Sequence, residues 1–201
     1  MIRSILAAAG VAVALSGCAL LSSPDPVQLY RFGSPDAVAI RAVADPVQVK
    51  LRAVEFPQES QGDRLLGVTG TQAAYIKGAR WVSPAAQLYA DSLEGAFAGQ
   101  ARAVRLIGRR ELTPTTRVLD IDVRSFETRY DDTGGVPTVV LSARARLLRF
   151  PERSVEAEQA FEVRQPATGN RIAAIVDAYD VATRDLNARI VAWTDANATG
   201  D

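Results

Sequence analysis

The sequence predicts a single domain of the α/β class (α+β type) with two layers, in which two main helices cover one face of a mostly antiparallel sheet. Most segments after residue 26 alternate apolar with polar side chains, which is typical of half-buried strands. Two segments instead repeat apolar residues at three- and four-residue steps, which is typical of amphipathic helices. Short turn motifs join several of the strands, and such hairpin connections favour antiparallel pairing.

Short strands are expected in the first half of the domain. Each is a run of apolar or β-branched residues, and in one of them Val47, Val49 and Leu51 alternate with polar side chains. Gly33 and Gly70 supply turns, because glycine adopts conformations that tight reversals need. The expected ranges are 28–32, 47–51, 65–69, 73–76 and 104–107.

Longer strands are expected in the second half, at residues 118–126, 139–147 and 155–163. In the first of them, apolar side chains alternate with Asp120 and Asp122. Residues 131–135, Asp-Asp-Thr-Gly-Gly, predict a hairpin loop, because paired glycines permit a tight reversal.

Two helices are expected. The first begins at Ser83-Pro84, since serine accepts hydrogen bonds from free N–H groups and proline fits the first helical position. Its apolar face ends near Gly99. The second runs from Asn170 to Trp193, and the residues after it are expected to fray.

The N-terminal segment has the pattern of a bacterial lipoprotein signal. An apolar stretch at residues 5–15 is followed by Ser16 and Gly17, which leave the backbone accessible to a signal peptidase, and then by Cys18, the only cysteine. The stretch is shorter than the about 20 residues that a transmembrane helix needs. We expect Cys18 to be acylated; the alternatives are an ordinary secretory leader or a buried thiol. The chain then divides into a signal peptide (1–17), a lipidated tether (18–26), the domain (27–196) and a frayed tail (197–201).

Composition excludes several functions. The 23 basic and 23 acidic residues balance, so no electrostatic signature of nucleic-acid binding is present. The chain has no histidine, which excludes Ser-His-Asp and Cys-His catalysis and every His-ligated metal site. It has no glycine-rich phosphate loop either, so it does not itself hydrolyse ATP. We expect no metal and no cofactor.

Asp120 and Asp122 are the strongest candidates for catalysis. Two residues apart on a strand, they point to one face about 7 Å apart, a spacing that glycoside hydrolases use. The alternation already explains them as the solvated face of a half-buried strand, and we prefer that interpretation. The acidic pair at residues 131–132 lacks the alternating ligands of a calcium loop. We therefore expect no catalytic residues.

Several short motifs follow one another along the chain. After the lipobox at Cys18 come Tyr-Arg-Phe at residues 30–32 and Ala-Arg-Trp-Val-Ser-Pro at residues 79–84, which leads into a helix. Residues 120–126 form an Asp-x-x-x-x-x-Phe strand, and the terminal helix closes with Trp193. In order and spacing, these motifs resemble the ABC-type transport auxiliary lipoproteins, the PqiC-like family.

The resemblance implies a lipid-anchored, non-enzymatic periplasmic subunit that works beside an MCE-domain protein and, through it, an ABC permease and ATPase in lipid transport between the membranes. Only Cys18 carries over with a role, as the residue that bears the diacylglycerol and palmitate. Trp81 matches the helix entry of the family, where we expect it to pack. The resemblance leaves open whether the protein forms a homo-oligomer. The alternative of another class is a structural or docking lipoprotein of a different envelope complex.

The length of the tether limits the reach of the domain. Residues 19–26 span at most about 26–29 Å when extended. A compact domain of this size has a diameter of about 40 Å. The protein would therefore reach only about 65–70 Å from its own membrane, so a partner has to project toward it.

The first prediction concerns Cys18. Several acyl chains on one residue hold a protein firmly to a membrane, whereas one chain holds it only marginally. Cys18→Ala should therefore leave an uncleaved or soluble exported protein, measured by detergent partitioning. Ala19 follows the cysteine, instead of the aspartate associated with inner-membrane retention, so we expect the wild type in the outer membrane. Partitioning of the wild type into the aqueous phase would contradict acylation.

Overall fold

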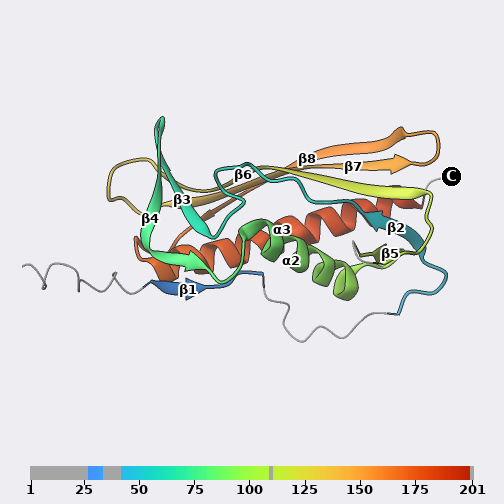
Figure 1. Ribbon diagram of the computed structural model, residues 1–201, viewed down its shortest axis with the longest axis horizontal. Coiled ribbons are helices and arrows are strands. Elements are labelled where there is room, and N and C mark those ends of the chain that lie inside the picture. Colours follow the sequence, from blue (N-terminus) through green and yellow to red (C-terminus); the bar gives the residue numbers. More distant parts are fainter. Residues whose placement is uncertain (1–26, 34–41, 109–110, 200–201) are drawn as a thin grey trace, which may run out of the picture.

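The computed structural model describes residues 27–33, 42–108 and 111–199, and within them eight strands and two helices are present (Figure 1). The strands are β1 (Gln28–Tyr30), β2 (Val47–Leu51), β3 (Arg64–Thr69), β4 (Gln72–Trp81), β5 (Val104–Ile107), β6 (Arg117–Tyr130), β7 (Thr138–Arg149) and β8 (Ser154–Pro166). The helices are α2 (Ala85–Gln100) and α3 (Ile172–Ala198).

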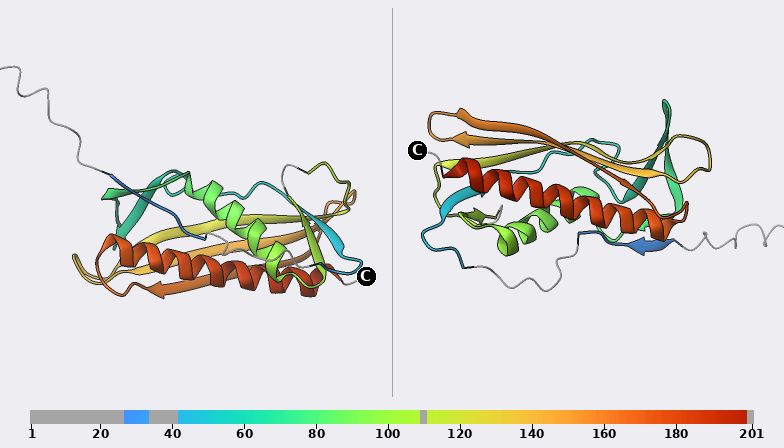
Figure 2. Two further views of the ribbon diagram at one scale, coloured as in Figure 1. Left: turned by 90° about the horizontal axis from the view of Figure 1, so that it is seen from below. Right: turned by 180° about the vertical axis from the view of Figure 1, so that it is seen from behind.

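The strands join in one sheet, and in Figures 1 and 2 both helices lie on the same side of β6, β7 and β8. α3 packs along β7 and β8, and α2 packs against α3 and β5. The 14 residues of β6 and the 27 residues of α3 extend over about 46 Å and about 40 Å. The domain is therefore elongated, and longer than the compact sphere expected from its size.

β6 is the strand on which the sheet is built. One of its edges pairs with β7 along nearly its whole length. The other edge is divided, because β2 pairs with Arg117–Leu119 and β3 pairs with Thr128–Tyr130. Between them the segment after β2 takes part of the edge, with the Glu55 amide donating to the Ile121 carbonyl at 2.9 Å.

The expectation of a mostly antiparallel sheet is wrong, because the sheet is mixed. Among the strands that the structure describes, β1–β4, β2–β5, β2–β6 and β3–β6 are parallel pairs. Antiparallel pairing is confined to the hairpins β3–β4, β6–β7 and β7–β8, and the sequence predicts the turns of the first two. The parallel pairs join segments that are distant in sequence, and turn motifs carry no information about such pairs.

The expected elements themselves are confirmed. β4 extends to Trp81, beyond the expected end at residue 76. α2 begins as expected, but no side chain caps it. Instead, the Ala85 and Ala86 amides donate to the carbonyls of Gly62 and Gln61 at 2.9 and 3.2 Å, so a tertiary contact replaces the serine cap.

The expected fraying after Trp193 is also corrected. α3 continues to Ala198, because Thr194 and Ala198 are fully buried and extend the packed face of the helix. The Thr194 hydroxyl donates to the Ile190 carbonyl at 2.8 Å, so its polar group is satisfied within the helix. The packed domain therefore extends past residue 196.

Aromatic rings from four parts of the chain form the centre of the core. The ring centroids of Phe32 and Trp81 lie 4.8 Å apart, and those of Phe126 and Tyr179 lie 4.9 Å apart. Trp81 meets Tyr179 edge to face at 5.2 Å. Burial raises the pKa of the Tyr179 phenol, whose oxygen accepts a hydrogen bond from Thr128 at 3.2 Å. This aromatic cluster joins the segment after β1 to β4, β6 and α3.

Gly33 lies where the chain leaves β1 and passes close to both helices. Its φ is +61°, and a Cβ built there would lie 2.4 Å from Ser92 Oγ on α2 and 3.3 Å from Thr183 Cγ2 on α3. Its amide donates to the Asp180 carboxylate at 2.8 Å. Only a residue without a side chain fits this position.

The second prediction compares two glycines with positive φ. Gly33→Ala combines the left-handed backbone cost, about 1–2 kcal/mol, with an overpacking cost of about 1–3 kcal/mol. Gly70→Ala is the matched control, since its φ is +56° and a Cβ there would meet nothing within 4 Å. Urea unfolding should show a larger loss of stability for Gly33→Ala. Equal losses would show that the close approach to Ser92 is not a constraint.

Candidate functional site

The expected anchor, Cys18, lies outside the described residues. The described chain begins at Val27, next to β1, which lies at one end of the elongated domain (Figure 1). β1 is held in parallel with β4, with Gln28 opposite Ala79 and Tyr30 opposite Trp81. The expected tether would therefore join the domain at the end formed by β1 and the β3–β4 hairpin, which we call the tether end.

Two aspartates of α3, far apart along the helix, accept hydrogen bonds from backbone amides of other segments. Asp180 accepts the Gly33 amide and pairs with Arg184. Near the other end of the helix, Asp195 accepts the amides of Arg102, Ala103 and Val104 at 2.8, 3.1 and 3.0 Å, which fixes the turn between α2 and β5. The sequence places Asp180 on a helix but Asp195 among the residues expected to fray, and only the fold shows that each binds a distant backbone segment.

Asp120 is not solvated, so the expectation of a wet strand face is wrong for this residue. It is 1% exposed and lies between two guanidinium groups, Arg146 at 2.5 Å and Arg52 at 3.4 Å. Asp122 lies on the same face of β6 and pairs with Arg124 at 2.5 Å and Arg144 at 3.3 Å. The alternation placed both residues correctly on the face away from the apolar core.

The two carboxylates serve as ion-pair partners across the sheet. Asp120 lies directly opposite Arg146, and Asp122 opposite Arg144, in the β6–β7 register. A general acid or nucleophile has to reach a substrate in a cleft. Asp120 is closed off from solvent, and arginines neutralise both side chains. The geometry therefore assigns the pair to structure and gives no support to a glycosidase site.

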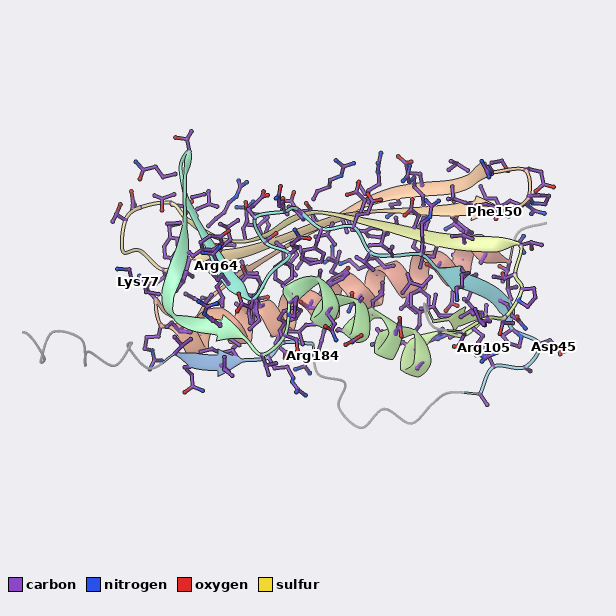
Figure 3. The ribbon with its side chains drawn as sticks, viewed as in Figure 1. Asp45, Arg64, Lys77, Arg105, Phe150 and Arg184 are labelled. Atoms are coloured by element: carbon purple, nitrogen blue, oxygen red, sulfur yellow. The ribbon has the colours of Figure 1, made fainter. Side chains whose placement is uncertain are left out.

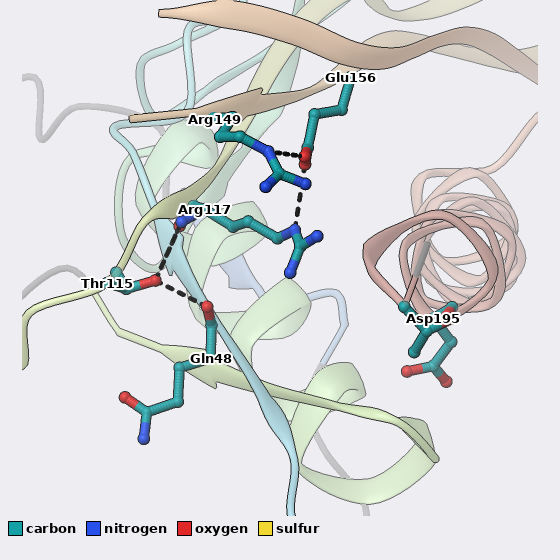
Figure 4. A network of polar contacts seen from close by, with 7 residues as sticks. Gln48, Thr115, Arg117, Arg149, Glu156 and Asp195 are labelled. Carbon is teal, nitrogen blue, oxygen red and sulfur yellow. Dashed lines mark hydrogen bonds and ion pairs between the residues drawn. The ribbon is translucent and has the colours of Figure 1, made fainter. Parts of the chain in front are cut away.

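A second polar network ties together the strand ends farthest from β1 (Figure 4). Glu156 on β8 accepts from Arg117 on β6 at 3.1 Å and from Arg149 on β7. Thr115 donates to the Gln48 carbonyl at 2.7 Å and accepts from the Arg117 amide at 3.2 Å. The network joins β6, β7 and β8 to β2 at this end.

A pocket of 470 Å³ lies between the second half of α2 and β5, also away from β1. Its walls are mainly apolar, with Phe97, Val104 and Leu106 among them, and Glu94, Arg105 and Glu111 supply polar groups. Its volume falls in the range of small-molecule sites. It holds neither of the aspartates singled out from the sequence.

In the part of the chain that the structure describes, no group of three or more His, Cys, Asp or Glu side chains could hold a metal ion. None of the described helices is long and apolar enough to cross a membrane.

The aromatic cluster also explains the sequence motifs. Phe32, Trp81 and Phe126 each belong to one of the short motifs, and the fold brings all three together against Tyr179. Trp193, the last motif residue, packs against Phe161 with 6.1 Å between ring centroids. The motifs therefore record contacts of the core, as expected for Trp81.

Comparison with known proteins agrees with this fold and these motifs. The chain belongs to the family of ABC-type transport auxiliary lipoprotein components, whose model matches residues 30–191. None of the curated proteins matches the chain.

Solved structures share the fold. A DUF330-family protein from Xanthomonas campestris is 24% identical, with a TM-score of 0.70 over 85% of this chain and 96% of that one. An uncharacterized protein is 16% identical, with a TM-score of 0.64 over 84% of this chain and 99% of that one. A hypothetical protein from Chlamydia trachomatis is 12% identical, with a TM-score of 0.57 over 78% and 99% of the two chains.

The third prediction separates the two aspartates. Asp120→Asn leaves two guanidinium groups around a buried amide and should lower the free energy of unfolding by about 2–3 kcal/mol, discounted because Arg52 is half exposed. Asp122→Asn should cost about 1 kcal/mol, since its partners are more accessible. Denaturant unfolding measures both. A double variant that folds and localises correctly yet loses function would revive the hydrolase interpretation.

Proposed function

We propose that the protein is a lipid-anchored periplasmic subunit of an MCE-type ABC transport system, which moves lipids between the inner and outer membranes and performs no catalysis of its own. The observation that carries this proposal is the family match over residues 30–191. The lipobox at Cys18 supports the anchor, and Ala19 supports the outer membrane as its location.

The arrangement of charges supports a non-enzymatic role. Asp120 and Asp122, the strongest candidates for catalytic carboxylates, form ion pairs with arginines on the sheet face. Without histidine, few groups remain for proton transfer at neutral pH. The protein would therefore contribute binding surface and position, while a partner ATPase would supply the energy.

The shape of the domain supports a partner contact away from the anchor. The tether enters at the tether end, whereas the loop between β5 and β6 lies at the opposite end (Figure 1). A partner that projects from the other membrane reaches the far end first. We therefore place the contact with the MCE-domain protein at the far end. The 131–135 loop lies between β6 and β7 at the tether end and is therefore a poorer candidate for this contact.

The fourth prediction tests this placement with two exposed apolar positions. Leu112, in the β5–β6 loop, is 99% exposed, and Val136, in the β6–β7 loop, is 60% exposed. A photo-crosslinking amino acid at Leu112 should capture an MCE-domain protein in native membranes, and the same group at Val136 should not. Mass spectrometry of the adducts, with copurification of the wild type, identifies the partner.

Two outcomes would overturn the proposal in different ways. Capture of the MCE-domain protein from Val136 alone would retain the function and reverse the orientation. Capture of another envelope complex from either position, with no MCE-domain protein in the copurified material, would replace the transporter subunit by a docking lipoprotein.

A further inference from the structure

We infer that the outer side of the tether end is a membrane-contact surface, which binds anionic lipid headgroups beside the acyl anchor. The inference rests on the anchoring at Cys18 proposed above. The surface, which we call the β1–β4 patch, comprises Val27, Leu29, Arg31, Arg64, Tyr75, Lys77, Arg80 and Val82.

The apolar part of the patch is exposed without having a place in the core. Val27, Leu29 and Val82 are 46%, 55% and 42% exposed. Tyr30 and Phe32 pack into the core, so the alternation of an extended strand turns Leu29 and Arg31 to the opposite side. These apolar side chains lie close together, because Leu29 is opposite Arg80 and the Val82 amide donates to the Tyr30 carbonyl at 2.8 Å.

The charged part of the patch is basic. Arg31, Arg64, Lys77 and Arg80 are all exposed, and within the described part of the chain Arg80 forms an ion pair with Asp63 at 2.7 Å. Figure 3 shows Arg64 and Lys77 at the tether end, with Asp45, Arg105 and Phe150 at the other end. A chain whose formal net charge is zero thus carries a local excess of cations beside its expected anchor.

The local geometry displays these side chains. The Arg64 guanidinium lies over the Tyr75 ring, 3.6 Å from its centroid, and the Tyr75 hydroxyl donates to the Glu59 carbonyl at 3.1 Å. Tyrosine beside cations and apolar residues is typical of a membrane interface. Gly78 has φ +77° inside β4, which lets this strand turn from the projecting hairpin to run beside β1 (Figure 1).

Neighbouring carboxylates do not cancel the patch. Including Asp63 and Glu59, the four cations outnumber the acids by two, and Asp180, which accepts the Gly33 amide near Arg31, is paired with Arg184. Asp131 and Asp132 follow Tyr130, which pairs with Thr69 near the tip of the β3–β4 hairpin. Both aspartates therefore follow the tip of the hairpin, whereas Arg80, eight residues along β4 from Gln72, lies beside β1 at its base.

The tether makes a weak surface effective. Each Lys or Arg near an anionic membrane improves binding by roughly fivefold, which is too little to hold a protein alone. An anchor within about 30 Å raises the local concentration of lipid headgroups, so the patch needs little affinity of its own. The patch therefore orients the domain on the membrane, while the acyl chains hold it there.

The test uses the acylated full-length protein in vesicles. Because Cys18 is the only cysteine, a single introduced cysteine is the one thiol open to labelling. Val82→Cys probes the patch. Val155→Cys is the matched control, because Val155 is also exposed but lies near the start of β8. Both carry an environment-sensitive dye, in vesicles of phosphatidylethanolamine with phosphatidylglycerol and in vesicles of phosphatidylcholine alone.

We expect a blue shift of the dye at Val82 in the anionic vesicles, a smaller one in phosphatidylcholine, and none at Val155. In the Val82→Cys protein, adding Arg31→Glu and Lys77→Glu should reduce the fraction of dye in contact with the anionic membrane more than tenfold. Arg102→Glu and Arg153→Glu make the same change of charge elsewhere and should leave that fraction unchanged. Equal spectra at both positions, or indifference to the Arg31 and Lys77 reversals, would overturn the inference. Failure of the wild type to incorporate into vesicles would instead refute the anchor.

Discussion

Both edges of β6 are needed to hold the rest of the domain in place. Along one edge β7 and then β8 continue the sheet, and on the other edge β2 and β3 share the strand without meeting each other as partners. β1 and β5 join only through β4 and β2. Phe126, in the same strand, brings β6 into the aromatic cluster against Tyr179 of α3. A change that shifted the register of β6 would therefore move both layers at once.

Local sequence signals predicted the elements well, because each such signal acts within one strand, turn or helix. The alternation around Ile121 and the glycine turn at Gly70 both lead to the observed structure. The parallel partners of β1, β2 and β3 could not be predicted in this way, since nothing near those strands encodes a partner distant in sequence. The cap of α2 is a similar case, because it comes from the carbonyls of Gln61 and Gly62 and not from Ser83.

For the candidate site, too, the sequence predicted local features and missed tertiary contacts. The alternation of β6 correctly put Asp120 on the face opposite the core. It could not show that Arg52, just after β2, and Arg146, on β7, enclose that carboxylate. Asp180 lies within the expected second helix, where nothing in the sequence indicates that it binds the Gly33 amide. In each case the missing information is tertiary: the polar side of a strand or helix becomes buried where another segment crosses it. Motif order was more informative than any single residue, since the motif aromatics meet in one cluster.

Contact of the β1–β4 patch with the membrane would change the distance that a partner has to span. A domain hanging freely from its tether could extend about 65–70 Å, but one resting on its tether end gives up the length of the tether. Its reach is then set by its own long axis, about 46 Å along β6. In return, the far end, with the α2–β5 pocket and the Glu156 network, is held at a fixed height and in a fixed direction. A partner projecting from the opposite membrane would then have to cover more of the distance, but would meet a surface already oriented to receive it.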